Sequence, residues 1–160
     1  MKNYLFLMAI LLFITLNLVT DKSVAQSQTD LNLDEAKREI ASSNNLYFQA
    51  FVKGDSSIFI NRYAEDCLIM VPNAKAMKGH RGALEFFKIA YDQIGLRDGE
   101  FMTTMVYGLG NDYVAEEGIW KSYNKDHVLF DQGKFLVLWK KTDRGWKMFR
   151  DSFSSDNKLN

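Results

Sequence analysis

Cysteine and proline are almost missing from this 160-residue chain, which contains one of each. A single cysteine, Cys67, cannot form a disulfide within the chain, so the fold must be stabilised by packing. Cys67 begins the apolar run Cys67–Val71, where a buried, unreactive thiol is favoured over a nucleophile. The chain has only two histidines, His80 and His127, and no Cys/His cluster. The sequence therefore predicts no metal site, and no cofactor is expected.

An excess of charge is missing as well, because 20 basic residues balance 20 acidic ones. Proteins that bind nucleic acid or anionic membranes carry basic surfaces, and no basic block occurs here. A glycine-rich phosphate loop before a helix and the Gly-x-Ser-x-Gly nucleophile motif are also absent from the sequence. We therefore expect no nucleic acid partner, and these motifs point to no particular enzyme.

The longest apolar run lies at the N-terminus. Lys2 precedes Tyr4–Val19, which is almost wholly apolar, and the small residues Ser23–Ala25 follow. This order is typical of a secretory signal peptide that is cleaved after Ala25. An uncleaved anchor is the alternative, but the run is shorter than the roughly 20 residues that a membrane span needs. We expect an exported protein, periplasmic or secreted, without membrane contact after cleavage.

The rest of the chain reads as one domain over residues 33–156, preceded by a flexible tail over residues 26–32. Apolar residues at helical spacing predict three helices, over residues 34–54, 55–63 and 79–95. A strand, Cys67–Val71, lies between the second and third helices, and four more strands follow from about Glu100 onward. Helices that precede a run of antiparallel strands indicate an α+β fold with the helices on one face of the sheet.

The last predicted hairpin, Gly133–Ser154, contains the candidate site. Its polar loop, residues 142–145, separates two segments in which apolar and polar residues alternate. The alternation places three residues of each segment on one face, namely Phe135, Val137 and Trp139 on the first and Phe149, Asp151 and Phe153 on the second. Asp151 is thus a carboxylate in an aromatic row. It is either a structural Asp bonded to a backbone amide or a cation, or a group that contacts a ligand.

Two further carboxylates, Glu116 and Glu117, are adjacent on a predicted strand. Neighbouring residues of a strand face opposite sides of the sheet. Either one of the two glutamates can therefore face the cavity, and parity alone leaves open which one. A solvated side chain is favoured for each.

Three local motifs link this chain to a known family. Gly54-Asp55 follows a helix, Tyr63-Ala64-Glu65-Asp66 precedes a strand, and Gly79-His80-Arg81-Gly82-Ala83-Leu84 opens a helix. Together with the order of elements, these motifs resemble the nuclear transport factor 2-like superfamily, which includes ketosteroid isomerases, SnoaL-type cyclases and many domains of unknown function. The resemblance covers about residues 33–156. It implies a nuclear transport factor 2-like (cystatin-like) cone, with three N-terminal helices packed on a curved, mostly antiparallel sheet.

The resemblance also implies a site inside the cone. The donor tyrosine of ketosteroid isomerases falls on Tyr47, whereas their general-base aspartate falls on Val71 and their second donor falls near Gly133. Two of the three roles are vacant, so ketosteroid isomerisation itself is not expected. Tyr47 and Asp151 remain the candidate catalytic residues, as hydrogen-bond donor and as acid or base.

We therefore expect a cavity that binds a small apolar or amphipathic molecule. Its expected ligand-binding residues are Tyr47, Phe135, Trp139, Phe149, Asp151 and Phe153. For the aromatic residues, an ordinary core between sheet and helices is the alternative. Three functions stay open: a binding protein, an isomerase, dehydratase, cyclase or hydrolase, and an interaction domain with a filled cone. Relatives often pair through the opposite face of the sheet, where Leu136 and Leu138 lie, so a homodimer is expected.

Overall fold

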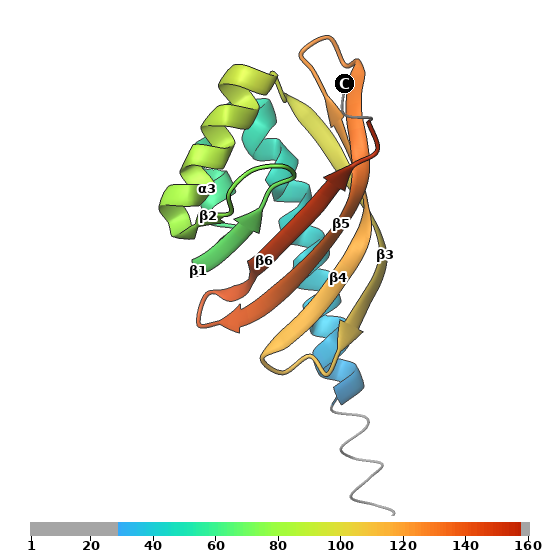
Figure 1. Cartoon of the computed structure of the whole chain (residues 1–160). Helices are drawn as coiled ribbons and strands as arrows, with labels where there is room; N and C mark the ends of the chain where they lie inside the picture. The colour runs from blue at the N-terminus through green and yellow to red at the C-terminus, as the bar shows by residue number, and fades with distance from the viewer. Residues whose placement is uncertain (1–28, 158–160) are drawn as a thin grey trace, which may run out of the picture.

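The structure, a computed structural model, describes residues 29–157. A helix over residues 29–53 comes first (Figure 1). The elements that follow are α2 (Ser56–Ile60), β1 (Tyr63–Met70), β2 (Met77–Lys78), α3 (Gly79–Lys88), the π-helix η1 (Ile89–Ile94), β3 (Asp98–Gly108), β4 (Tyr113–Tyr123), β5 (Leu129–Thr142) and β6 (Gly145–Ser155). The expected signal peptide and its cleavage site lie outside the described residues. No helix within residues 29–157 combines the length and apolar character that crossing a membrane requires.

The strands form one six-stranded sheet in the order β2-β1-β6-β5-β4-β3. All neighbours are antiparallel except β1 and β6, which run parallel. In Figure 1 the long N-terminal helix runs behind the curved sheet, and α3 stands beside β1 and β2. The predicted α+β architecture, with helices packed on a curved and mostly antiparallel sheet, is confirmed.

The helix over residues 29–53 packs on the sheet through a stripe at helical spacing. Its buried members are Ala36, Ile40, Ser43, Asn44, Tyr47, Phe48, Ala50 and Phe51. Gly54 ends the helix with a φ of 64°, and the amide of Asp55 donates to the carbonyl of Ala50. The helix already includes residues 29–32, which we had assigned to the flexible tail. Asn32 there donates to Asn111 (3.1 Å), so this segment is docked on the domain.

The third predicted helix changes its winding halfway. Residues 79–88 are α-helical, but Ile89–Ile94 form a π-helix that ends at Gly95, where φ is 84°. A π-turn has more residues per turn than an α-helix, so it shifts the phase of every side chain after it. Ile94, which the regular stripe predicts to be core-facing, is 57% exposed for this reason.

β1 begins earlier than the sequence predicts. The predicted strand begins at Cys67, but the observed strand runs from Tyr63 to Met70. Its pairing with β6 shifts register between Tyr63 and Leu68, which accommodates the irregular start. The earlier start places the side chain of Tyr63 inside the domain, where it is 2% exposed.

Candidate functional site

A cavity of about 130 Å³ lies between the sheet, the N-terminal helix and the α3–η1 segment. Most of its lining is aromatic, and its polar groups are one tyrosine, one serine and two aspartates. The lining residues are Tyr47, Phe48, Phe86, Ala90, Ile94, Leu96, Phe101, Trp120, Ser122, Phe130, Asp131, Phe135, Asp151 and Phe153. The volume is close to the roughly 150 Å³ of an apolar protein cavity that holds benzene. The space therefore suits a molecule with a single ring.

Asp151 is the buried carboxylate of this cavity. It lies on β6, which pairs with β1 on one side and with β5 on the other, opposite Ile69 and Val137. Its side chain is 7% exposed, and its Oδ2 accepts a hydrogen bond from the hydroxyl of Tyr63 at 2.6 Å. A carboxylate held by strands on both sides has a fixed direction.

Burial raises the pKa of Asp151 to about 6. The hydrogen bond from Tyr63 acts in the opposite direction, and the negative charge of Glu116 raises the pKa further. A carboxyl group that titrates near neutral pH can both accept and donate a proton under ordinary conditions. The arrangement therefore fits the acid or base role proposed for Asp151 from the sequence.

Two tyrosines stand next to this carboxylate. Tyr47, on the N-terminal helix, lines the cavity, and its hydroxyl also interacts with that of Tyr63. Burial, followed by the charge of Asp151, raises the pKa of both tyrosines well above the ordinary value. Both hydroxyls therefore stay protonated and can donate hydrogen bonds. Tyr63 was not among the expected site residues, because we had placed it at the end of a helix.

Glu116 points toward the helices and is buried, so the expectation of a solvated side chain is wrong for it, and Glu117 faces the other side. Glu116 is fully buried and accepts hydrogen bonds from Asn44 (2.7 Å), Thr103 (2.6 Å) and Trp139 (2.9 Å). Burial raises its pKa, and these three hydrogen bonds lower it. Because it does not line the cavity, Glu116 acts on the site through its charge.

Trp139 lies in the same network rather than in the cavity wall. It is 0% exposed, and its indole N–H donates to Oε2 of Glu116. The sequence places it correctly on the inner face, but the structure buries it behind the cavity. As a cavity-lining residue Trp139 is therefore corrected to a core residue.

Phe149 is on the wrong face for the expected site. The β5–β6 register shifts between Leu138, which pairs with Arg150, and Trp139, which pairs with Met148. The extra residue of this bulge reverses the alternation, so Met148 takes the inner position. The ring of Phe149 lies 5.7 Å from that of Tyr113 and 3.6 Å from the guanidinium of Arg150. Phe149 therefore belongs to the outer face of the sheet.

The other four expected ligand-binding residues lie together around the cavity. Tyr47, Phe135, Asp151 and Phe153 all line the cavity. The rings of Phe101 and Phe135 meet edge to face at 4.9 Å, and those of Trp120 and Phe153 do so at 5.9 Å. Parity along β4 places Trp120 on the same face as Glu116, so it could have been found once the direction of one glutamate was known.

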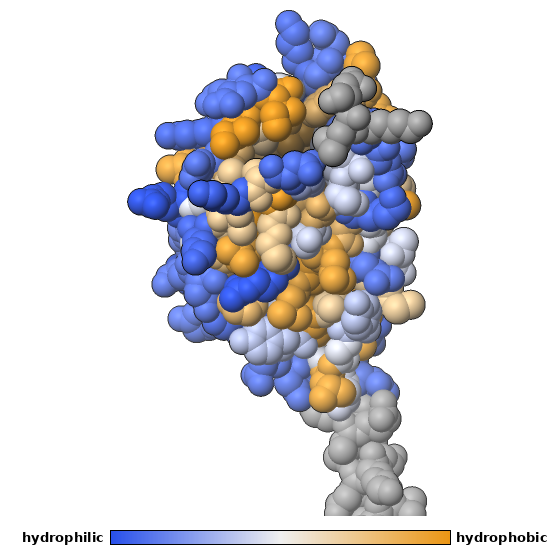
Figure 2. Space-filling view, in the orientation of Figure 1, coloured by the Kyte–Doolittle hydropathy of each residue, from blue (hydrophilic) through white to orange (hydrophobic). Residues whose placement is uncertain are grey.

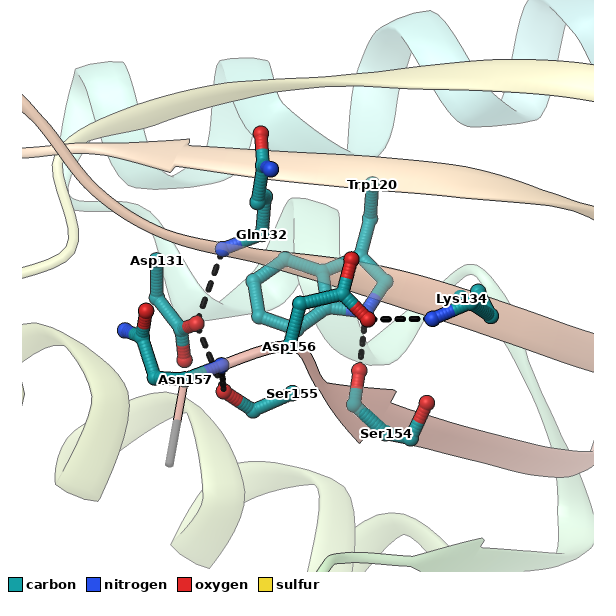
Figure 3. Close-up of polar contacts among 8 residues, drawn as sticks. All are labelled: Trp120, Asp131, Gln132, Lys134, Ser154, Ser155, Asp156 and Asn157. Carbon is teal, nitrogen blue, oxygen red and sulfur yellow. Dashed lines mark hydrogen bonds and ion pairs between the residues drawn. The ribbon is translucent and has the colours of Figure 1, made fainter. Parts of the chain in front are cut away.

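A polar cluster surrounds the end of the cavity near the C-terminus (Figure 3). Asp131 accepts hydrogen bonds from the amide of Gln132 (2.8 Å) and the hydroxyl of Ser155 (2.7 Å). The indole N–H of Trp120 donates to the carbonyl of Ser154 (3.1 Å), and Lys134 is paired with Asp156. These contacts fix the end of β6 against β5 and hold Asp131 at the cavity edge.

Comparison with solved structures identifies the fold. An NTF-2 like protein of unknown function from Shewanella oneidensis is 21% identical, with a TM-score of 0.62 over 74% of this chain and 98% of that one. A ketosteroid isomerase-like protein from Erwinia carotovora atroseptica is 20% identical, with a TM-score of 0.62 over 79% and 97%. A cystatin-like domain of unknown function from Nostoc punctiforme is 16% identical, with a TM-score of 0.66 over 78% and 79%.

No family model and no curated protein matches the sequence. The structural likeness is nevertheless plain, and the chain has the nuclear transport factor 2-like fold, also described as cystatin-like. The resemblance inferred from the sequence is thus confirmed at the level of the fold.

Proposed function

We propose that this protein binds a small apolar or amphipathic molecule in the cavity that Asp151 and Tyr47 line. The observation that supports this most is a buried carboxylate that opens onto an aromatic-walled space within a well-packed core. Binding sites for small molecules are mostly apolar and contain a few fixed polar groups, and this cavity has that composition. The small volume favours a one-ring molecule over a steroid-sized one.

Benzyl alcohol, a neutral one-ring probe, tests this function. Titration should quench or shift the fluorescence of Trp120, which lines the cavity, and should perturb the NMR signals of the other lining residues. Ala90→Leu fills the cavity from the helical side, and Ala41→Leu adds the same atoms at an exposed helical position. We expect the first variant to abolish binding and the second to retain it. Absence of saturable binding in the unmodified protein would contradict the proposal and favour an interaction domain with a filled cone.

Catalysis at the same site is the second candidate function, because Asp151 titrates near neutral pH with Tyr47 as a nearby donor. An isomerase-type enzyme would remove a proton from the carbon next to a carbonyl group. Cyclohexanone fits the cavity, and deuterium exchange at that carbon can be followed by NMR in D₂O. Catalysed exchange that disappears in Asp151→Asn and slows in Tyr47→Phe would support the role. Deuterium exchange at the uncatalysed rate would contradict this catalytic role and leave ligand binding as the proposed function.

We further propose that two copies pair through the outer face of the sheet. Figure 2 shows hydrophobic side chains gathered over this part of the molecule, with hydrophilic ones around them. Five exposed apolar residues lie on neighbouring positions of β3, β4 and β5, namely Met102, Met105, Tyr107, Ile119 and Leu136. Such a contiguous apolar patch is a common feature of protein–protein interfaces.

Sedimentation velocity tests the pairing. The unmodified protein should sediment as a dimer at micromolar concentration, and Leu136→Lys should convert it to a monomer. Val52→Lys is the matched control, since Val52 is 60% exposed on the N-terminal helix, away from the patch. A monomer at high micromolar concentration would remove the homodimer.

We also propose that the chain is exported and that residues 1–25 are removed. The support is the order of charged, apolar and small residues at the N-terminus. N-terminal sequencing of the protein isolated from its own host should begin at Gln26. A chain that retains Met1 would contradict this proposal.

A further inference from the structure

The charges of the cavity all have the same sign. Two of its lining residues, Asp131 and Asp151, carry carboxyl groups, and no lysine, arginine or histidine is among the described residues that line it. An anionic ligand would be repelled by both carboxylates and would meet no cation there. The composition therefore disfavours carboxylates and phosphates and favours a neutral or positively charged molecule.

The two carboxylates lie at different depths. Asp131 accepts its hydrogen bond from Ser155 at the polar cluster near the C-terminus, where Figure 3 shows it. Asp151 is four residues before Ser155 on the same strand, which corresponds to about 13 Å of extended chain. The cavity therefore has a half-buried carboxylate at its edge and a second, more deeply buried one.

The inner carboxylate keeps acceptor capacity for a ligand. Oδ2 of Asp151 accepts from Tyr63, and no other donor to this carboxylate occurs among residues 29–157. Aromatic rings such as those of Phe101, Trp120 and Phe135 surround the space in front of it. The faces of such rings attract cations, and Trp does so best. Aromatic walls and one available carboxylate are together a chemical complement to an ammonium group.

We propose that the ligand is a small organic cation, a protonated amine carried on a single ring or a short alkyl chain, whose ammonium group binds Asp151. This inference rests on the ligand-binding function proposed above and specifies its ligand class. The aromatic walls hold the apolar part, Asp151 accepts a hydrogen bond from the ammonium group, and Asp131 supplies attraction at the cavity edge. Tyr63 holds the carboxylate in position, and its hydroxyl remains bonded to Oδ2.

The proposal makes binding depend on pH through Asp151. The titratable groups that face it are Tyr47 from the N-terminal helix, Tyr63 and Cys67 from β1, and Glu116 from β4. From α3, His80 contacts the backbone carbonyl of Tyr63 at 3.0 Å. Because Asp151 gains its negative charge as pH rises through about 6, a cation should bind more tightly at pH 7.5 than at pH 5. A neutral ligand should bind about equally at both.

Three probes with the same ring separate the possibilities. Benzylamine is a cation throughout this pH range, benzyl alcohol is neutral and benzoate is an anion at pH 7.5. Each is titrated at pH 5 and pH 7.5 into the unmodified protein, into Asp151→Asn and into Asp143→Asn. The last variant removes an exposed carboxylate in the β5–β6 turn, so it controls for net charge.

At pH 7.5 we expect benzylamine to bind at least about tenfold more tightly than benzyl alcohol, as for a hydrogen bond to a charged group, and benzoate not to bind. Asp151→Asn should remove this preference, whereas Asp143→Asn should retain it. Equal or tighter binding of benzyl alcohol, or a preference that survives in Asp151→Asn, overturns the cation proposal but leaves the binding function standing. If neither benzylamine nor benzyl alcohol binds, both the cation proposal and the proposed binding function are overturned.

Discussion

Asp151 and Glu116 are two carboxyl groups in one core, and their burial has a cost. Burial raises the pKa of each, and the charge of Glu116 raises that of Asp151 further. The folded state therefore binds more protons than the unfolded state at mildly acidic pH. Stability contributed by the protonated form is present at low pH and is lost as pH rises through the folded pKa.

The pH dependence of the free energy of unfolding tests the raised pKa of Asp151. Its pKa is about 6 in the folded state, against about 4 when unfolded, so the contribution of Asp151 to the free energy of unfolding should fall by roughly 2 kcal/mol between pH 4 and pH 7. Asp151→Asn cannot ionise, and Tyr63 can still donate to the amide oxygen. Urea unfolding across this range should show a much flatter profile for the variant and the unchanged profile for Glu117→Gln. Identical profiles for Asp151→Asn and the unmodified protein would contradict the assignment.

Substitution of Glu116 tests how much stability depends on an acceptor for buried hydrogen-bond donors. Glu116→Ala removes the acceptor of Asn44, Thr103 and Trp139 at once and leaves a space in the core. We expect a loss of roughly 3–5 kcal/mol in the free energy of unfolding at pH 7, measured by urea denaturation. Glu117→Ala, on the outer face, should change stability by less than about 0.5 kcal/mol. A small loss for Glu116→Ala would mean that water replaces the carboxylate.

Among single residues, the sequence predicts well those whose position depends only on local alternation. Phe135, Asp151 and Phe153 reach the cavity because the alternation is regular at their ends of the hairpin. Tyr63 escapes prediction, because its place depends on where β1 starts. That start is set by pairing with β6, which is distant in the chain.

At the scale of elements, the β6 bulge decides which aromatic residues belong to the site. The bulge leaves Phe149 without a pairing partner in β5. The alternating sequence gives no sign of this extra residue, so simple alternation predicts Phe149 on the inner face. The π-helix η1 likewise shifts Ile94, which becomes exposed but still lines the cavity. Local irregularities of this kind are created by tertiary packing and leave no clear sequence pattern.

Paired variants test the effect of the bulge. Phe153→Ala enlarges the cavity, and Phe149→Ala truncates a ring on the outer face. We expect the first to change the affinity for benzyl alcohol at least about fivefold through lost wall contacts, and the second to leave it within about twofold. Isothermal titration calorimetry measures both. An equal loss for Phe149→Ala would place that ring back in the cavity wall.

Gly133 controls the contact between β5 and β6 at the cavity edge. A Cβ atom there would overlap the carbonyl oxygen of Ser154, a backbone atom that cannot move without opening the strand pair. We expect Gly133→Ala to destabilise the fold by roughly 2–4 kcal/mol in urea unfolding. Gly95→Ala meets no neighbour and bears only its positive φ, which costs about 1–2 kcal/mol. The reverse ranking would contradict this account.

At the scale of the whole molecule, the sheet has central strands that are paired on both sides and two edge strands that are paired on one side only. β6 and β5 are flanked on both sides, whereas β2 and β3 are the edges. Hydrogen exchange monitored by NMR should therefore show the slowest amides in β5 and β6 and faster exchange at the outer amides of β3. The short β2 should exchange early as well. Uniform protection across the six strands would argue that the whole sheet opens only by global unfolding.

The fold class was predictable from the order of helices and strands, and the comparisons confirm it. The cavity was predictable only as a consequence of that fold. Its size depends on how Trp120, Phe101 and Phe86 fill the cone, and such packing involves residues from separate elements. Composition alone does not encode it.

The parallel pairing of β6 with β1 has a consequence for the order of events during synthesis. Tyr63 and Asp151, which meet across this pair, are 88 positions apart, and β6 is the last strand of the domain. Until it has been made, β1 and β5 both present open edges, and the cone has no closing wall. The native sheet can therefore be completed only after β6 has been synthesised, and a chain that stops before β6 leaves the edges of β1 and β5 unpaired.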